Sequence, residues 1–347
     1  MTIKYYNVFD DLEQYPDAWL YVVTSMRGPG KTYSFFNGCL EKGIKFLYLK
    51  RTQIDIELLS SPHFNPLSPI NRDKKTNYVF ERIYDGISGI YRGDEDGNAA
   101  GECLGYAMSL SSIHKYKGFD LSEVEYMCLD EFIPQLSERV NHSEGNLMLD
   151  LYLTVNRDRE ARGRPALKLI LFANATELYC PITDTLQIVD DLSEMNARNE
   201  EYRYSTERKI LLHRLKYSAS ANDDSAIYNA MKNTKWAKMA FDGEFAYNDF
   251  SRVKKIPLKN MVCFCSVIYN DRAYYIYRHR ENGLFYMCRA KGGVDDEYDL
   301  DIEADRRRFY LTYALTLKNE ISDGNMFFSD YSAYNLIFNF NKIYKNL

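Results

Sequence analysis

The stretch that decides the fold runs from residue 18 to residue 32, where Ala18-Trp-Leu-Tyr-Val-Val-Thr24 is followed by Ser25-Met-Arg-Gly-Pro-Gly-Lys-Thr32. The first part is an apolar run of buried-strand length, and the second is a glycine-rich turn. Residues 32–42 contain no proline and precede Gly43, which predicts a helix. Residues 45–50 then predict a second strand. The order strand, helix, strand predicts a βαβ unit with a right-handed crossover.

The chain beyond this unit extends the α/β pattern. Between residues 60 and 118, short strands separated by Asp-Gly turns predict an antiparallel insertion. Apolar strands are then predicted at 124–129 and 167–173, with a helix over 145–159 between them. We therefore predict an α/β first domain with a mainly parallel sheet.

A second, smaller α+β domain is predicted after an exposed connection. Residues 218–225, Ser-Ala-Ser-Ala-Asn-Asp-Asp-Ser, have the small polar composition of a linker. The predicted domains are therefore 1–217 and 226–347. Three strands are expected in the second domain, at 261–269, 273–278 and 284–288.

Composition excludes several classes of protein. The chain has 347 residues, 46% hydrophobic and 27% charged, which is typical of a folded protein and long enough for two domains. Its seven cysteines form no CxxC pair and predict reduced packing thiols. No signal peptide or membrane-spanning stretch is present, so an intracellular soluble protein is expected. With a net charge of −5, contacts with nucleic acid must come from local basic loops.

The glycine-rich turn has the properties of a phosphate-binding loop. Backbone amides of such a turn approach phosphate closely, and the following helix N-terminus adds positive partial charge. Lys31 is predicted to reach the β- and γ-phosphates, and Thr32 to help hold Mg²⁺. The other predicted cradle residues are Ser25, Met26, Arg27, Gly28, Pro29 and Gly30. Ser25 departs from the usual leading glycine, and the alternative is a chance turn with an exposed lysine.

Two acids follow the apolar strand Tyr126-Met-Cys-Leu. Asp130 is predicted to support Mg²⁺ and Glu131 to orient the attacking water, which are the roles that paired acids have in P-loop ATPases. Taken alone, the pair could be a solvated turn. Its combination with Lys31 and Thr32 favours a catalytic site.

Three further residues are candidates for the chemistry. Arg157 and Arg159 could stabilise charge on the γ-phosphate of a neighbouring subunit, although a solvated helix end is the simpler interpretation. Asn174 follows the strand 167–173 and could detect the γ-phosphate or position water; the alternative is an ordinary turn.

Together these motifs resemble the packaging ATPases of phi29-like phages, within the additional-strand P-loop motors that include terminase large subunits. Residues 25–32 resemble the arginine-containing P-loop of that family, 129–132 its acidic strand end, 172–175 its sensor strand and 155–160 the segment with its trans-acting arginine. The resemblance makes Arg157 the preferred finger and Arg159 the second choice. Arg27 could contact phosphate or reset the subunit after hydrolysis.

The resemblance implies an ATP- and Mg²⁺-dependent motor that drives double-stranded DNA into a prohead in the host cytoplasm. It implies a homopentameric ring docked on the capsid portal, with a structural RNA as a further possible partner. The C-terminal domain is expected to be a ribonuclease-H-like remnant. Because residues 262–268 contain no aspartate, we predict no nuclease activity, and a role in DNA guidance or portal attachment.

Basic loops are the predicted DNA contacts. The leading candidate is Lys115-Tyr116-Lys117, in the loop before the acidic strand, and Lys50-Arg51 is the weaker one. A solvated basic loop is the alternative for the first. Two other functions stay open for the chain: a P-loop helicase or other nucleic-acid-dependent ATPase, and a non-enzymatic portal adaptor.

Overall fold

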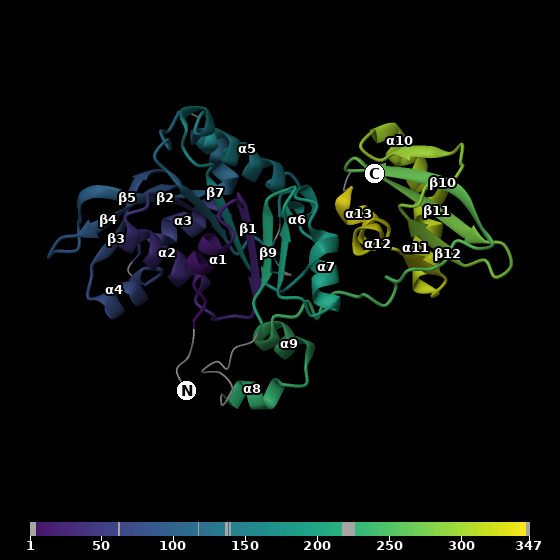
Figure 1. Cartoon of the computed structure of the whole chain (residues 1–347), viewed down its shortest axis with the longest axis horizontal. Helices are drawn as coiled ribbons and strands as arrows, with labels where there is room; N and C mark the ends of the chain where they lie inside the picture. Colours follow the sequence, from purple (N-terminus) through teal and green to yellow (C-terminus); the bar gives the residue numbers. More distant parts are fainter. Residues whose placement is uncertain are drawn as a thin grey trace. The chain divides into compact units, whose positions relative to one another are not determined.

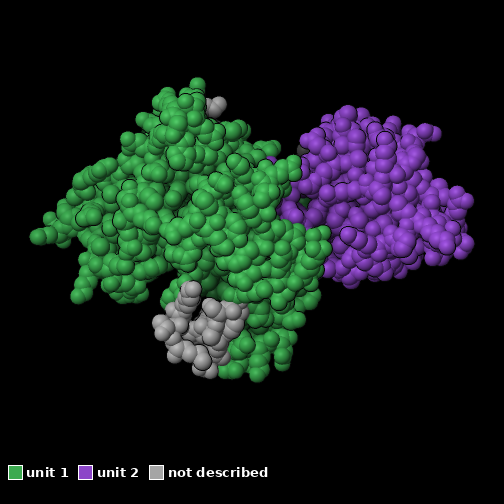
Figure 2. Space-filling model, viewed as in Figure 1, with its two compact units in different colours: residues 1–182, 194–247 green, residues 183–193, 248–347 purple. Residues whose placement is uncertain are grey.

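The computed structural model describes residues 5–61, 63–116, 118–135, 138, 140–216 and 226–344. The chain forms two compact units, shown in green and purple in Figure 2. Unit 1 comprises Met1–Ile182 and Glu194–Tyr247, and unit 2 comprises Thr183–Ser193 and Asn248–Leu347. The chain passes from unit 1 to unit 2 for the last time after Tyr247, whereas the sequence predicted a linker at 218–225, a segment that lies outside the described residues.

Unit 1 is built on one sheet that is parallel at its centre. In the described residues this sheet has nine strands in the order β3-β4-β5-β2-β6-β7-β1-β9-β8. The strands are β1 (Leu20–Ser25), β2 (Phe46–Lys50), β3 (Tyr78–Tyr84), β4 (Ile87–Gly93), β5 (Ala99–Ser109), β6 (Tyr126–Asp130), β7 (Lys168–Asn174), β8 (Tyr202–Ser205) and β9 (Ile210–Arg214). Strands β5, β2, β6, β7, β1 and β9 are parallel neighbours. Their carboxyl ends therefore share one edge.

Helices lie before, between and after these strands in the chain (Figure 1). They are α1 (Val8–Gln14), α2 (Lys31–Lys42), α3 (Gln53–Leu59), α4 (Ser68–Lys74), η1 (Leu110–Tyr116), α5 (Glu144–Asn156), η2 (Glu160–Arg162), α8 (Ala226–Met231) and α9 (Lys235–Asp242). Helix α6 (Pro181–Thr185) and helix α7 (Val189–Ala197) each include residues of both units.

Aromatic rings pack α2 against the sheet. The Phe35 ring lies edge-on to Phe46 with centroids 5.3 Å apart, and Phe36 packs on Tyr48 at 4.7 Å. All four side chains are almost completely buried. Every residue of β1 is also buried, because the strand lies between β7 and β9. The glycine-rich loop between β1 and α2 is thus supported by the best-packed part of the unit.

The predicted βαβ unit and antiparallel insertion are confirmed: β1-α2-β2 forms the first, and β3-β4-β5 the second. The hairpin β8–β9 was not predicted, because the charged residues around it conceal the short apolar run Ile210-Leu-Leu. Strand β9 is fully buried as a parallel neighbour of β1, and β8 pairs with it antiparallel.

Unit 2 contains a five-stranded sheet in the described residues, in the order β13-β10-β11-β12-β14. Its strands are β10 (Met261–Tyr269), β11 (Arg272–His279), β12 (Phe285–Cys288), β13 (Glu297–Asp299) and β14 (Met326–Phe328). Its helices are α10 (Glu303–Phe309), η3 (Tyr310–Ala314), α11 (Leu315–Ser322), α12 (Tyr331–Phe338) and α13 (Phe340–Ile343). The three predicted strands correspond to β10, β11 and β12.

Residues 183–193 belong to unit 2 through polar contacts. Asp184 accepts a hydrogen bond of 2.5 Å from Tyr269, and Asp190 forms a 2.5 Å ion pair with Arg289. These contacts hold residues 183–193, which come from the middle of the chain, in unit 2. None of the helices formed by the described residues has both the length and the apolar character needed to cross a membrane.

Candidate active site

The loop between β1 and α2 has the backbone conformation of a phosphate cradle. Gly28 and Gly30 adopt φ values of 83° and 93°, which residues with a side chain rarely adopt. Gly30 is the N-cap of α2, and its carbonyl accepts the hydrogen bond of the Ser34 amide at 2.8 Å. A cavity of about 390 Å³ lies against this loop, and its lining residues are Arg27, Gly28, Pro29, Gly30, Lys31, Thr32, Tyr33, Asp130, Glu131, Ala173 and Asn174. Residues 27–32 of the predicted cradle and the two acids thus line one cavity, whereas Ser25 and Met26 do not line it.

Lys31 is buried in this cavity. Its ammonium group donates to the Ser25 hydroxyl, to the Asn174 side-chain oxygen at 3.3 Å and to the Met26 carbonyl at 3.5 Å. Burial lowers the pKa of Lys31 to about 8, although the nearby Asp130 and Glu131 carboxylates act in the opposite direction. Ser25, which replaces the usual glycine, therefore supplies an oxygen that a glycine lacks.

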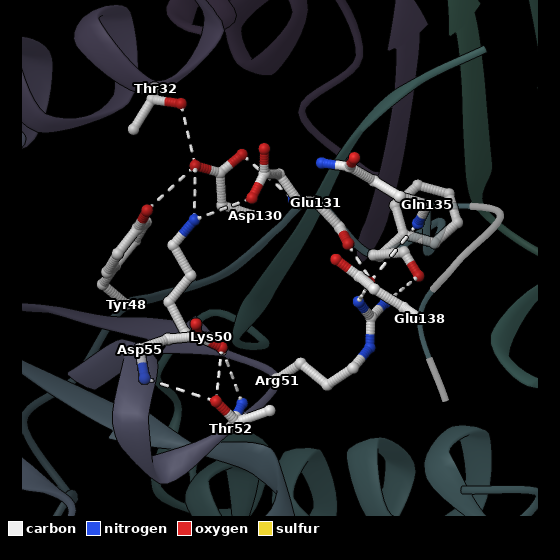
Figure 3. Close-up of polar contacts among 11 residues, drawn as sticks. Thr32, Tyr48, Lys50, Arg51, Thr52, Asp55, Asp130, Glu131, Gln135 and Glu138 are labelled. Atoms are coloured by element: carbon white, nitrogen blue, oxygen red, sulfur yellow. Dashed lines mark hydrogen bonds and ion pairs between the residues drawn. The ribbon is translucent and has the colours of Figure 1, made fainter. Parts of the chain in front are cut away.

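Asp130 is the centre of a hydrogen-bonded group (Figure 3). One of its oxygens accepts from the Thr32 hydroxyl at 2.9 Å and from the Tyr48 hydroxyl at 2.8 Å, and lies 3.5 Å from the Lys50 ammonium group. Burial and the proximity of Asp130 raise the pKa of Tyr48, so this phenol stays protonated and donates. The Thr32 hydroxyl and the Asp130 carboxylate are hard oxygen ligands of the kind that Mg²⁺ prefers. The two residues fit a Mg²⁺ site.

Glu131 is the first residue after β6 and lies at the cavity wall. Its φ of 58° is in the left-handed region, which is unusual for a residue with a side chain. The carboxylate is 57% exposed and lies 3.3 Å from the Lys50 ammonium group. Burial lowers the pKa of Lys50, but Asp130 and Glu131 outweigh it and raise the pKa above its ordinary value. Lys50 is therefore a stable cation between the two acids.

Asn174 ends β7 directly beside Ser25, with which it is paired in the parallel register. Its side-chain oxygen is the group that accepts from Lys31. The structure therefore brings together Lys31, Thr32, Asp130, Glu131 and Asn174, as the sequence predicted.

The two candidate finger arginines differ sharply in their surroundings. The Arg157 side chain is 82% exposed and is 4.0 Å from Asp158. Arg159 is only 4% exposed and donates to three backbone carbonyls, of Val124 at 2.5 Å, Pro165 at 3.1 Å and Ser122 at 3.4 Å. Arg159 therefore holds loops of its own subunit together. These contacts disfavour Arg159 as the second finger.

Arg157 lies at the edge of the sheet opposite to its own cavity. It follows α5, and the Asn156 side chain accepts from the Leu167 amide at 2.8 Å. Leu167 immediately precedes β7, whose other end is Asn174, and seven strand residues span about 20 Å. Arg157 is thus too far from the phosphate loop of its own subunit to contact it.

The predicted DNA contacts have mixed outcomes. Lys50 and Arg51 lie within the acidic group at the site, and Arg51 is paired with Glu138 at 2.6 Å and Glu144 at 2.7 Å. These partners leave neither cation free for a DNA phosphate, which disfavours this secondary choice. Lys117 and the side chains of Lys115 and Tyr116 are outside the described residues.

Two features of the site were not predicted. Tyr48 donates to Asp130, but a tyrosine in an apolar strand gives no sequence signal of such a role. The end of α9 also contacts the phosphate loop: the Arg27 amide donates to the Ala240 carbonyl at 3.1 Å. A Cβ atom on Gly243, which caps α9 with a φ of 63°, would lie 2.9 Å from the Met26 nitrogen. The end of α9 and Gly243 therefore support the phosphate loop.

A parallel α/β sheet, a glycine-rich loop at the start of a helix and two acids at the neighbouring strand end define the P-loop class of nucleotide-binding proteins. Within this class, residues 3–302 match the family model of the podovirus DNA encapsidation protein (Gp16), and the chain belongs to that family. It acts in DNA encapsidation.

Solved structures with the same fold come from phage motors. The structure of the bacteriophage phi29 viral genome packaging motor assembly is similar with a TM-score of 0.66 and 19% identity, covering 98% of this chain and 99% of that one. The phi28 gp11 DNA packaging motor gives a TM-score of 0.62 and 16% identity, covering 100% of this chain and 99% of that one. No curated protein sequence matches the chain.

Proposed function

We propose that this protein is the ATP-hydrolysing subunit of a motor that moves double-stranded DNA into a prohead. The observation that supports it best is the single cavity shared by Lys31, Thr32, Asp130, Glu131 and Asn174. In this proposal the glycine-rich loop and Lys31 bind the β- and γ-phosphates.

Thr32 and Asp130 would hold Mg²⁺, which neutralises charge on the phosphates when bound. Glu131 accepts the proton of the attacking water, since its carboxylate faces the same cavity and is accessible to solvent. Asn174 is close enough to Lys31 to respond to a γ-phosphate that attracts the ammonium group.

Hydrolysis is completed by a neighbouring subunit. Arg157 is exposed and about 20 Å from its own cavity, so it can stabilise phosphate charge only across a subunit interface. This requirement, together with the resemblance of the chain to phage motors, supports a homo-oligomeric ring, which we propose to be a pentamer around DNA on the portal in the host cell. A structural RNA is a further partner to test.

Unit 2 is proposed to be a ribonuclease-H-like unit without nuclease activity, which guides DNA or attaches the subunit to the portal. Among the described residues, no group of three or more His, Cys, Asp or Glu side chains is arranged to hold a metal ion by itself. Residues 262–268, on β10, also lack the aspartate that a two-metal nuclease needs.

The proposal is tested by nucleotide binding and turnover of purified rings with DNA. Glu131→Gln should lower kcat by at least about 100-fold and leave nucleotide affinity nearly unchanged, because the carboxylate acts on water and not on the bound phosphates. Lys31→Ala should abolish binding. Glu123→Gln, which changes an exposed acid in the turn before the same strand, is the control.

Absence of turnover in the unsubstituted protein would reject the motor and favour a portal adaptor. ATP-dependent strand separation without a prohead would instead favour a helicase.

A further inference from the structure

Arg51 connects the loop that carries Glu131 to the first turn of α5. Its guanidinium donates to the carbonyls of Glu131 at 3.1 Å and Phe132 at 2.9 Å, and pairs with Glu138 at 2.6 Å and Glu144 at 2.7 Å. Figure 3 shows the Arg51 side chain directed toward Glu138 and the Glu131 backbone, while Lys50 points toward Asp130. The planar guanidinium can bind four acceptors at once, which a lysine ammonium group at this position could not do with the same geometry.

Glu144 depends on this contact. It is the first residue of α5, is only 4% exposed, and one of its oxygens has no hydrogen-bond partner in the described part of the chain. Burial raises the pKa of Glu144, and the charge of Arg51 opposes that shift. A buried carboxylate is costly without a partner, so the position of Arg51 strongly determines where the first turn of α5 lies.

Helix α5 ends at the proposed trans-acting arginine. Its 13 residues span about 20 Å, from Glu144 beside the site to Arg157 at the opposite edge of the sheet. One face of the helix is buried through Met148, Leu151 and Val155, so it moves as a rigid body and not residue by residue. A shift of its first turn is therefore carried to its far end.

We infer that Arg51 is a positioning residue that couples the Glu131 loop of one subunit, through Glu144 and α5, to the Arg157 finger that the same subunit presents to its neighbour. This inference rests on the proposed function, since it assumes that Glu131 activates water and that Arg157 acts in trans. Arg51 does not line the cavity and so does not contact nucleotide itself. Its effect should appear in turnover and not in nucleotide affinity.

The test uses mixed rings in which one kind of subunit donates the finger and the other hydrolyses ATP. Donor subunits carry Lys31→Ala and cannot bind nucleotide, and receiver subunits carry Arg157→Ala and lack only their own finger. In a 1:1 mixture, turnover comes from receivers beside donors. Adding Arg51→Gln to the donors alone should lower kcat of the mixture about tenfold, with KM changed by less than about twofold.

Three further donor variants separate positioning from loss of folding. Arg51→Lys should recover part of kcat, because it restores a charge beside Glu144 but not the four-way contact. Arg72→Gln, which removes an exposed arginine of α4, should leave kcat unchanged. Thermal unfolding and ring size are measured for each donor, and Glu138→Gln, which loses only the more exposed acid partner of Arg51, provides a milder variant with a smaller decrease in kcat.

The outcomes distinguish the two levels of the proposal. If the mixture of Lys31→Ala and Arg157→Ala subunits is inactive, the trans finger itself is wrong. If that mixture is active and Arg51→Gln in the donors leaves kcat unchanged, the coupling through α5 is wrong while the proposed function stands. A change in KM alone would also overturn the coupling, because it would place Arg51 at the nucleotide.

Discussion

The Thr32 hydroxyl donates a 2.9 Å hydrogen bond to Asp130, a residue 98 positions further along the chain. The contact joins the first turn of α2 to the end of β6, a strand that is separated from β1 by β7 in the sheet. It exists because parallel strands bring their carboxyl ends to one edge. The same edge carries Ser25 and Asn174, so strand order brings the proposed metal-binding pair next to the proposed phosphate loop.

Nucleotide affinity should fall as pH rises through about 8. In the free protein, burial lowers the pKa of Lys31 to about 8, so the ammonium form is dominant below this pH and is lost above it. A bound triphosphate favours the charged form, so binding above pH 8 requires proton uptake. The dissociation constant should increase by about tenfold per pH unit until the pKa of the complex is reached.

Titration calorimetry in buffers of different ionisation enthalpy measures the number of protons taken up when nucleotide binds, at pH 7 and at pH 9. Proton uptake should be near zero at pH 7 and substantial at pH 9. Equal proton uptake at both values would contradict the assignment of Lys31 as the phosphate ligand that titrates.

Gly243→Ala should weaken nucleotide binding by about tenfold although Gly243 does not line the cavity. Its Cβ would lie 2.9 Å from the Met26 nitrogen and 3.1 Å from the Ser25 carbonyl carbon, so the phosphate loop must shift. Gly163→Ala is the matched control. It also places a side chain at positive φ, 71°, at a cost of about 1 kcal/mol, but meets no atom within 4 Å.

Fluorescent-nucleotide titration compares the two variants. Both should lose some stability to heat, and only Gly243→Ala should lose affinity. If Gly243→Ala and Gly163→Ala bind nucleotide with equal affinity, the end of α9 does not influence the phosphate loop.

The sequence was sufficient for the parts of the site that follow strands. Lys31 is the first residue of α2, and Asp130 and Asn174 are the last residues of β6 and β7, so strand and helix patterns place all three at the shared edge. The burial of Arg159 could not be predicted, because a charged residue in a charged stretch gives no indication that its side chain donates to the carbonyls of Ser122, Val124 and Pro165.

The contribution of α9 to the site could not be predicted for a related reason. Gly243 follows a short helix and looks like an ordinary C-cap, since nothing in its neighbours indicates contact with residues 25–26. Likewise, Lys50 and Arg51 read as free cations at a strand end. Only the packing of β2 against β6 shows that acids surround them.

Arg157→Ala should lower ATP turnover without lowering stability, whereas Arg159→Ala should lower the free energy of unfolding. Arg157 is exposed, so its loss should leave stability unchanged and lower turnover by about 1,000-fold, as expected for a trans finger. Arg159→Ala removes the side-chain donor to the carbonyls of Val124 and Pro165, while Ser122 keeps a hydrogen bond from Arg164, and should lower the free energy of unfolding by about 2–4 kcal/mol. Chemical denaturation and ATP turnover measure the two effects.

Arg162→Ala is the control for Arg157, because Arg162 is 74% exposed in the same segment and also lies near Asp158. Its turnover should match that of the unsubstituted protein. A loss equal to that of Arg157→Ala would assign the effect to the charge of the segment and not to one finger.

The salt dependence of DNA binding separates the two predicted DNA contacts. Replacing Lys115 and Lys117 together by alanine should reduce the slope of log K against log salt by about 1.8, because each phosphate contact contributes about 0.9. Lys50→Ala should leave the slope unchanged, since the Lys50 ammonium group lies 3.3 Å from Glu131 and 3.5 Å from Asp130 and already neutralises charge there. Fluorescence anisotropy with a DNA duplex over 50–200 mM salt measures both slopes.

The contrary outcome is that Lys50→Ala lowers the slope by about 0.9, the value of one phosphate contact, and that the double variant leaves it unchanged. DNA would then pass along the end of β2 and not along η1. The acidic group around Lys50 must then open when DNA binds, because one ammonium group cannot pair with two carboxylates and a phosphate at once without losing most of each interaction.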